Sequence, residues 1–237
     1  MKTTAPQHED DFARRKAKYQ PVANLLREMY GVPQWRQHLA PLDELISTIL
    51  SQSTSDTNRD RAFYALKERF PSWEAVRDAP LEDVIATIRP AGLANQKGPR
   101  IQEVLRRITS ERGELSIDFL AELPLDEAKA WLTSLNGVGP KTAAIILLFA
   151  FGRPAFPVDT HVHRLSKRIG FIGSKVNAEK AHRLMEQIVP PDDYYVFHLN
   201  LIQHGREICH ARSPECERCP LQPYCDDYQR RAASSSE

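Results

Sequence analysis

Apolar side chains recur at helical spacing along most of this chain. In residues 42–50, for example, the apolar positions fall one, three or four residues apart and share one helical face. No segment shows the sustained alternation that is typical of a β-strand. The pattern therefore predicts an all-α fold with short connections. The predicted helices cover 43–50, 73–76, 81–88, 100–108, 125–135, 141–151, 161–169, 178–188 and 192–208, and a further helix begins at Ser55 or Asp56.

Composition and charge exclude several classes of protein. Hydrophobic residues make up 41% and charged residues 27% of the 237 residues, which is typical of a globular protein and unlike collagen, a coiled coil or a disordered chain. The formal net charge of +1 argues against a protein that coats nucleic acid, but it allows a local basic face. The longest apolar run, 143–151, is about half the length of a membrane-spanning helix. The N-terminus lacks the apolar core of a signal peptide, so we expect a cytoplasmic or nucleoid protein without a membrane partner.

All four cysteines, Cys209, Cys216, Cys219 and Cys225, lie in the last thirty residues, in the pattern C-x6-C-x2-C-x5-C. Disulfides are disfavoured because a cytosolic setting keeps thiols reduced. Zinc accepts four thiolates, but zinc sites usually contain two close cysteine pairs, and only Cys216 and Cys219 are close here. An iron–sulfur cluster is also held by four thiolates. The spacing alone leaves zinc and iron–sulfur open.

A second motif, Leu-Asn-Gly-Val-Gly-Pro-Lys-Thr-Ala at 135–143, joins two predicted helices. Gly137 and Gly139 can adopt conformations closed to other residues and let another backbone approach closely. Pro140 suits the first turn of a helix, where its missing N–H is no loss. The free N–H groups of that turn would form a site for an anion such as a DNA phosphate. The alternative is a plain packing element between two helices.

Both motifs resemble those of one family. The cysteine spacing resembles the cluster loop of the endonuclease III family of DNA glycosylases, and residues 135–143 resemble the helix-hairpin-helix of the same superfamily. Residues 154–161 resemble the loop that carries the essential aspartate of the family, here Asp159. Lys141 matches the lysine of bifunctional members, and its separation of 18 residues from Asp159 equals the family spacing. The resemblance implies a 4Fe-4S cluster on the four cysteines and catalytic roles for Lys141 and Asp159.

These two residues suit the chemistry of base removal. Cleavage of an N-glycosidic bond passes through a cationic, oxocarbenium-like sugar, which the carboxylate of Asp159 would stabilise. The amine of Lys141 would attack C1′ and form a Schiff base, which permits strand cleavage by β-elimination. The amine must be neutral to attack, and a helix N-terminus favours the neutral form. The plainer interpretation makes Lys141 a solvated lysine and Asp159 the cap of a helix that begins at Thr160.

Further positions match family residues that extrude the damaged base and fill the gap. Leu93 follows a glycine and matches the leucine that enters the base stack. Ser53, rather than Gln52, occupies the position that is usual for the family glutamine. Either Gln52 fills the gap in place of the family glutamine, or this protein inserts less strongly into the base stack.

The resemblance also implies roles for three further positions. In the family, the loop after the first cysteine contacts DNA phosphate, and here it offers Arg212 together with the acidic Glu215. The resemblance therefore implies that Arg212 binds DNA. The loop as a whole is only weakly basic, because Glu215 offsets the charge of Arg212. Asp56 and His161 match positions near the base pocket and are the weaker candidates.

The resemblance covers about 12–229 and implies two all-α domains. A six-helix barrel with the hairpin is expected at 34–153, and an iron–sulfur domain at 12–33 plus 154–229. The polar segments 1–11 and 230–237 are expected to be disordered tails. The implied activity is removal of damaged pyrimidines from duplex DNA, with lyase cleavage at the abasic site, by a monomer. The alternatives are a glycosylase for mismatched thymine or an alkylated base, and a non-catalytic DNA-binding member.

Overall fold

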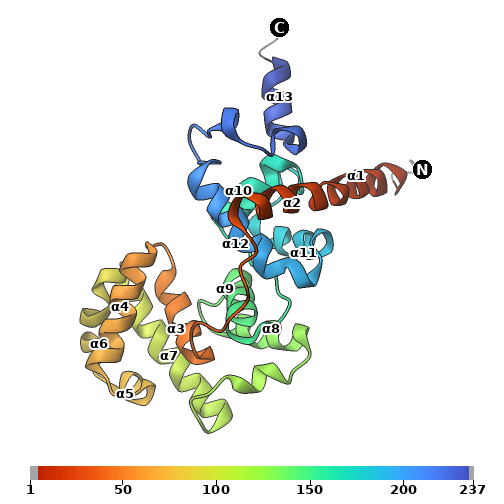
Figure 1. Cartoon of the computed structure of the whole chain (residues 1–237). Coiled ribbons are helices and arrows are strands. Elements are labelled where there is room, and N and C mark those ends of the chain that lie inside the picture. The colour runs from red at the N-terminus through yellow and green to blue at the C-terminus, as the bar shows by residue number, and fades with distance from the viewer. Residues whose placement is uncertain (1–4, 235–237) are drawn as a thin grey trace. The chain divides into compact units, whose positions relative to one another are not determined.

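The computed structural model describes residues 5–234, and within them every regular element is helical, as the apolar spacing predicts (Figure 1). Two compact units divide the chain. The central unit is the continuous segment Arg36–Arg153, and the terminal unit combines the described residues up to Trp35 with those from Pro154 onward. Among residues 5–234, no helix has both the length and the apolar character needed to cross a bilayer.

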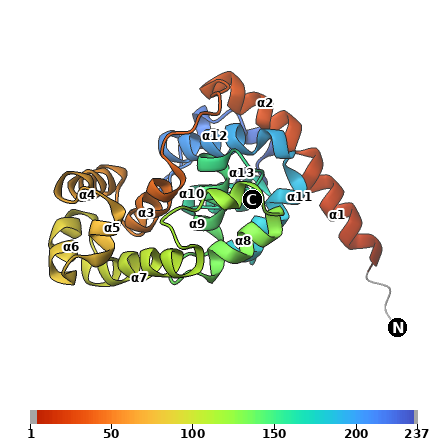
Figure 2. The same ribbon diagram turned by 90° about the horizontal axis from the view of Figure 1, so that it is seen from below.

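The central unit is built around one long helix, α7 (Ala94–Arg112), which packs against α5 and α6 (Figures 1 and 2). Helices α3 and α4 pack on each other, and α4 also contacts α6. The bounds are α3 (Pro41–Ser51), α4 (Asp56–Arg69), α5 (Trp73–Asp78), α6 (Leu81–Ile88), η1 (Arg89–Ala91), η2 (Asp118–Ala121), α8 (Leu125–Ser134), α9 (Pro140–Ile145) and the π-helical turn η3 (Ile146–Ala150).

Local signals in the sequence explain why these helices start and what they bury. Pro41 is the first residue of α3, and acidic residues follow in the first turn, where they interact favourably with the helix dipole. Ser55 caps α4 by accepting a hydrogen bond from the Asn58 amide at 3.3 Å, so the cap is Ser55 rather than Asp56.

The helices of the central unit bury a core of large apolar side chains. Each large apolar side chain removed from water contributes about 1.5–3 kcal/mol. Fully buried members of this core include Leu45, Ile46, Ile49, Leu66, Ile88, Ile101 and Leu105.

The terminal unit joins the two ends of the chain. Its helices α10 and α12 pack against each other, and α2 packs on α12. The bounds are α1 (Ala5–Ala17), α2 (Tyr19–Tyr30), α10 (Thr160–Ile169), α11 (Ala178–Ile188), η4 (Pro191–Asp193), α12 (Tyr194–Glu207), η5 (Cys216–Arg218), η6 (Gln222–Tyr224) and α13 (Asp226–Ser234).

Close contacts fix how the helices of the terminal unit cross. Gly205 of α12 lies against α10, because a β-carbon at this position would come within 2.8 Å of His161 Nδ1. Phe197 of α12 makes edge-to-face contacts with Tyr19 and Phe171, at centroid distances of 5.1 and 5.9 Å. The close approach at Gly205 and the aromatic contacts of Phe197 therefore set the position of α12.

Several elements differ from the prediction. Helix α7 begins at Ala94 and not at residue 100, and Pro99 lies inside it. The helix predicted at 141–151 divides into α9 and η3, and no helix was predicted at α2. In the two expected tails, residues 5–11 and 230–234 are helical, whereas 1–4 and 235–237 lie outside the described residues. An ion pair within α13 contributes to the helix at the C-terminal end, since Asp227 pairs with Arg231 at 2.8 Å.

A buried lysine connects three segments of the central unit. Lys97 is 1% exposed, and its Nζ donates hydrogen bonds of 2.8 Å to the carbonyl oxygens of Leu50 and Ala91. These carbonyls belong to the last turn of α3 and to η1, where helix carbonyls lack partners within the helix. Burial, and secondarily the charge of Arg100, lowers the pKa of Lys97. When protonated, the Lys97 ammonium group interacts favourably with the negative C-terminal end of the α3 dipole.

Replacing this lysine should destabilise the central unit. Lys97→Met preserves most of the volume but leaves two buried carbonyls without a donor, at a cost of about 1–3 kcal/mol each. We expect the melting temperature to fall by about 4–8 °C or more, at about 2–4 °C per kcal/mol for a chain of this size. Lys180→Met, at an exposed position of α11, supplies the control. Equal melting temperatures for the two variants would contradict the structural role of Lys97.

Candidate functional site

The sequence predicts unusual backbone conformations at both glycines of the hairpin at 135–143. The structure has one at Gly137 but not at Gly139. Gly137 has a φ of +78°, which is accessible to glycine, whereas Gly139 is extended and precedes α9 as its N-cap. A β-carbon at Gly139 would meet no atom of the described protein within 4 Å. Internal packing therefore does not require a glycine at position 139. The space beside Gly139 stays open for an approaching ligand.

Lys141 follows the hairpin directly. Pro140 is the first residue of α9, as expected, and Lys141 is the second, with a half-buried side chain. The next two residues, Thr142 and Ala143, are buried in the central unit. The helix continues into the π-helical turn η3, and π-helical turns are frequent at functional sites. The backbone that carries Lys141 is thus anchored on its C-terminal side.

The segment before Asp159 is buried and irregular, and polar side chains satisfy its backbone. The Phe156 amide donates to Glu186 at 3.1 Å. His182 Nδ1 lies 3.0 Å from the Phe156 carbonyl, and His198 Nδ1 lies 3.0 Å from the Pro157 carbonyl. Buried backbone without such partners would be costly. These bonds fix the chain directly before Asp159.

Asp159 itself caps α10. Its Oδ1 accepts a hydrogen bond from the Val162 amide at 2.7 Å, and the side chain is half-buried. The capping role expected from the sequence is confirmed. It uses one carboxylate oxygen, so the same residue can still act on a ligand through the other.

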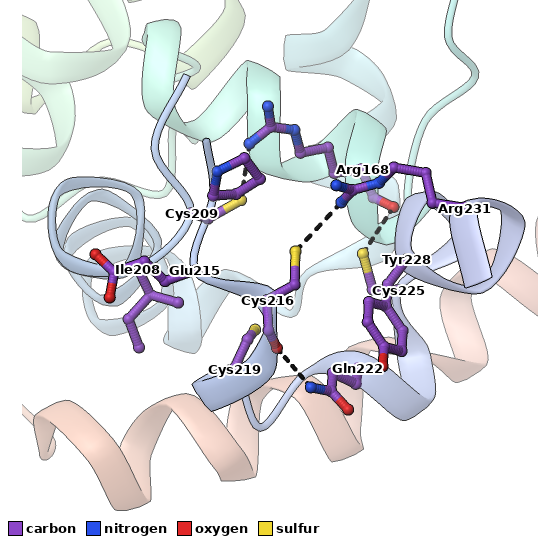
Figure 3. Close-up of a pocket in the computed structure, with 11 residues that line it drawn as sticks. Arg168, Ile208, Cys209, Glu215, Cys216, Cys219, Gln222, Cys225, Tyr228 and Arg231 are labelled. Atoms are coloured by element: carbon purple, nitrogen blue, oxygen red, sulfur yellow. Dashed lines mark hydrogen bonds between the residues drawn. The ribbon is translucent and has the colours of Figure 1, made fainter. Parts of the chain in front are cut away.

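The four cysteines lie around one cavity in the terminal unit (Figure 3). All four are half-buried free thiols. Cys209 follows α12, Cys216 is the first residue of η5, Cys219 directly follows η5, and Cys225 precedes α13. Among residues 5–234, no three His, Cys, Asp or Glu side chains converge closely enough for a single metal ion. A donor set of four thiols around a shared cavity fits a four-iron cluster, whose ligands are held farther apart than those of one zinc ion.

Basic side chains and one imidazole contact the sulfur atoms. Arg168 Nη1 donates to Cys209 Sγ at 3.2 Å, and Arg231 Nη2 donates to Cys216 Sγ at 3.2 Å (Figure 3). Such hydrogen bonds offset the negative charge of thiolates and tune the potential of a cluster. The residues present therefore provide both the ligands and the charge compensation that an iron–sulfur cluster needs.

A histidine lies behind the third cysteine. His204 Nε2 is 3.4 Å from Cys219 Sγ, and its Nδ1 is 3.1 Å from the hydroxyl of Tyr30. Burial, and secondarily the charge of Arg218, lowers the pKa of His204 to about 4.

The residues expected at the base stack lie on two exposed turns of the central unit. Ser53 and Leu93 are exposed and have left-handed backbones, with φ of 54° and 49°. Leu93 is 50% exposed although it is large and apolar. Gln52 differs, because its side-chain amide is bonded within the unit to Arg100 and to the Gly137 carbonyl.

The weaker candidates have ordinary surroundings. Asp56 is exposed and pairs with Arg59 at 3.4 Å. His161 Nδ1 lies 3.2 Å from Arg164 Nη2 within the terminal unit. Arg212, which is expected to contact DNA phosphate and is not one of these weaker candidates, is exposed in the loop after Cys209.

The expected acidic character of that loop is reduced by local pairing. Glu215 pairs with Arg218, and its Oε1 lies 3.1 Å from His210 Nε2. The Arg218 guanidinium, followed by His210, lowers the pKa of the Glu215 carboxyl. The negative charge of Glu215 is therefore partly offset beside Arg212.

Sequence reasoning missed one carboxyl close to the hairpin. Glu44 lies on α3, is half-buried, and accepts a hydrogen bond from Thr48 Oγ1 at 3.2 Å. Burial raises the pKa of this carboxyl, while the Thr48 hydroxyl and the positive charges of Arg59 and Lys141 act in the opposite direction. No signal marked Glu44 in advance, because acidic residues are common in a first helical turn.

The raised pKa of Glu44 implies a specific pH dependence. A carboxyl with a raised folded-state pKa contributes stability below its unfolded pKa and loses that contribution as the pH rises through the folded pKa. Glu44→Gln removes this titration. The melting temperature of the variant relative to the parent should therefore increase from about pH 4 to about pH 7. The exposed Glu68→Gln is the matched control, and a pH-independent difference for Glu44→Gln would contradict the assignment.

Comparison with known proteins agrees with this arrangement. A profile of the HhH-GPD superfamily of base excision DNA repair proteins matches residues 46–191, and one of the iron–sulfur binding domain of endonuclease III matches residues 209–225. The chain is 35% identical to endonuclease III of Thermotoga maritima, over 89% of this chain and 94% of that protein. It is 34% identical to endonuclease III of Bacillus subtilis, over 82% and 84%.

A solved structure shows the same fold. It is a trapped covalent intermediate of endonuclease III with DNA, which matches with a TM-score of 0.79 and 29% identity over 92% of this chain and 98% of that one. The chain therefore has the all-α helix-hairpin-helix DNA glycosylase fold, with the iron–sulfur binding segment at residues 209–225. The hairpin before Lys141, the four thiols around one cavity and these similarities lead to one conclusion: the chain belongs to the endonuclease III family of helix-hairpin-helix base excision DNA repair proteins, with a 4Fe-4S cluster as its cofactor.

Proposed function

We propose that this protein is a bifunctional DNA glycosylase and abasic-site lyase that acts on oxidised or otherwise damaged pyrimidines in duplex DNA. The observation that carries the proposal is the position of Lys141, a half-buried lysine directly after the Gly137–Pro140 turn. The family membership and the similarity to a trapped endonuclease III–DNA covalent intermediate support it. The protein would act as a monomer in the cytoplasm, on nucleoid DNA.

The reaction begins with loss of the base. The bond between C1′ and the base nitrogen breaks, and the departing base takes the bonding electron pair and acquires a proton. The unprotonated Nζ of Lys141 forms a new bond to C1′. The C1′–O4′ bond of the sugar ring then breaks, O4′ takes up a proton released from Nζ, and a protonated Schiff base remains between Nζ and C1′. Loss of a proton from C2′ breaks the C3′–O bond and releases the phosphate of the 3′ strand.

Asp159 stabilises the positive charge of the sugar and moves protons. The carboxylate oxygen that is not used by the Val162 amide is the one available for this role. A carboxylate near C1′ lowers the energy of an oxocarbenium-like sugar. The buried bonds to Phe156 and Pro157 hold the preceding backbone, so Asp159 is presented by a fixed segment.

The turns of the central unit bind the DNA backbone and insert into the base stack. The clear surface at Gly139 and the turn at Gly137 suit the approach of a phosphate. Leu93 enters the base stack from its exposed, left-handed turn, with Ser53 on the second turn. In the terminal unit, Arg212 adds a phosphate contact from the cluster loop.

The cluster has a structural role. Cys209, Cys216, Cys219 and Cys225 bind it, and it cross-links the loop from α12 to α13. A 4Fe-4S cluster supplies electron-transfer chemistry in other settings, but the cleavage steps above need none. Removal of the cluster should therefore act on folding and DNA docking.

Borohydride trapping tests the nucleophile. A duplex with one thymine glycol or abasic site should give a covalent protein–DNA adduct, because reduction converts the Schiff base into a stable amine. Lys141→Ala should give no adduct on a denaturing gel, whereas the exposed Lys180→Ala should trap like the parent protein. An adduct of normal yield from Lys141→Ala would disprove the assignment, and a panel of single-lesion duplexes would identify a different substrate.

Loss of one cluster ligand tests the structural role. Cys216→Ala should lower the iron content and the visible absorbance of the cluster, and lower the melting temperature of the protein. Binding to an abasic-analogue duplex should weaken with it, because the loop that carries Arg212 loses its anchor. Ser213→Ala, in the same loop, controls for local disturbance of the iron content. A folded, fully active Cys216→Ala protein without iron would contradict this role.

A further inference from the structure

The side chain of Gln52 lies between two other segments of the central unit. Its Nε2 donates a hydrogen bond of 2.9 Å to the carbonyl oxygen of Gly137 in the hairpin. Its Oε1 accepts a hydrogen bond of 2.9 Å from Arg100 Nη1 on α7. Gln52 directly follows α3, so one amide group joins the end of α3, the middle of the hairpin and the long helix of the unit.

Arg100 completes a closed set of contacts. A β-carbon added at Gly137 would lie 2.1 Å from Arg100 Nε. The guanidinium group therefore occupies the space where a side chain of residue 137 would lie. Gly137 also has a φ of +78°. The position therefore requires glycine for two reasons: its left-handed backbone and the space that Arg100 occupies. Gln52, Arg100 and Gly137 each contact the other two.

The chemistry of the position selects an amide side chain. Gln52 must donate to a carbonyl and accept from a guanidinium, and an amide does both with one group. A carboxylate would keep the bond to Arg100 but would place an oxygen against the Gly137 carbonyl. An aliphatic side chain would lose both bonds. The hydrogen bond to the charged guanidinium is also the stronger kind.

Other contacts of α7 hold the two polar residues Ser134 and Asn136, which precede Gly137. Asn136 Nδ2 donates to Glu103 at 2.8 Å, and Arg107 Nη2 donates to Ser134 Oγ at 2.8 Å. The end of α8 and the first residues of the hairpin are therefore tied to α7, and Gln52 adds a connection to the end of α3. Lys141 follows Gly137 by four residues.

We propose that Gln52 is a positioning residue of the lyase reaction. Together with Arg100, it holds the turn at Gly137, so that the hairpin presents its backbone and Lys141 to DNA in one fixed geometry. This proposal rests on the proposed function of Lys141. It differs from a role for Gln52 inside the base stack, since both ends of its amide are bonded within the protein and Ser53 is the exposed residue of that turn.

The first measurement is hydrogen exchange in the DNA-free holoprotein, followed by mass spectrometry. Gln52→Glu keeps the bond to Arg100 and loses the one to Gly137, and Gln52→Leu loses both. In each variant, exchange of the hairpin peptide that contains 137–143 should rise about tenfold, because one hydrogen bond is worth about 1–1.5 kcal/mol. Exchange in α12 should stay unchanged. Gln187→Glu makes the same chemical change on the exposed surface of α11 and should leave the hairpin as it is.

The second measurement is the single-turnover trapping rate with saturating protein and an abasic-site duplex. The rate should fall about tenfold in Gln52→Glu and Gln52→Leu, and remain at the parent value in Gln187→Glu. Arg100→Leu combined with Gln52→Leu should be no slower than the slower single variant, because both changes break the same set of contacts.

Each contrary outcome is distinguishable. Unchanged hairpin exchange in both Gln52 variants would overturn the proposal, as would weaker DNA binding with unchanged exchange, which places Gln52 in the DNA interface. Raised exchange throughout the protein would show a general loss of stability and would also overturn it. If the parent protein traps no DNA, the lyase proposal fails, and hydrogen exchange still decides whether Gln52 holds the hairpin.

Discussion

The geometry of the central unit depends on carbonyl groups at helix ends that need a donor from elsewhere. Lys97 supplies two such bonds from a fully buried position, to the last turn of α3 and to η1. Burying an ammonium group is expensive unless each of its bonds is well made. Other polar residues of α7 bind neighbouring segments: Arg100 contacts Gln52, Glu103 contacts Asn136 of the hairpin, and Arg107 contacts Ser134 at the end of α8. One helix thus sets the positions of every turn to which we assign a DNA contact in this unit.

The terminal unit applies the same principle to different segments. His182 and His198 bind the carbonyls of the buried chain before Asp159. Arg164 and Arg168 donate to carbonyls of the cysteine loop, including that of Cys209 at 2.9 Å. Polar side chains that are remote in sequence therefore satisfy irregular backbone in both places. A loop held in this way can carry a reactive group without regular secondary structure of its own.

Periodicity in the sequence predicted the helical class and most helices, because apolar spacing reports directly which face is buried. It placed α6 and α11 at their observed bounds. The motifs led to Lys141, Asp159 and the cysteines because their spacing is chemically specific. Lys97 could have been found, since it falls on the apolar stripe of α7 with Ile101, Val104 and Leu105. Glu44 and the Gln52–Arg100 contact could not, because they depend on which helix ends meet in space.

The left-handed backbones of Ser53 and Leu93 have a consequence for protein engineering. A residue with a β-carbon loses about 1–2 kcal/mol in this conformation, which glycine adopts freely. Selection for heat resistance alone would favour glycine or asparagine at these two positions. The variants that survive heating best would then lack the leucine side chain that we assign to the base stack. Directed evolution of this protein therefore needs a repair assay in every round, since thermal selection and base extrusion impose opposite demands on the same two residues.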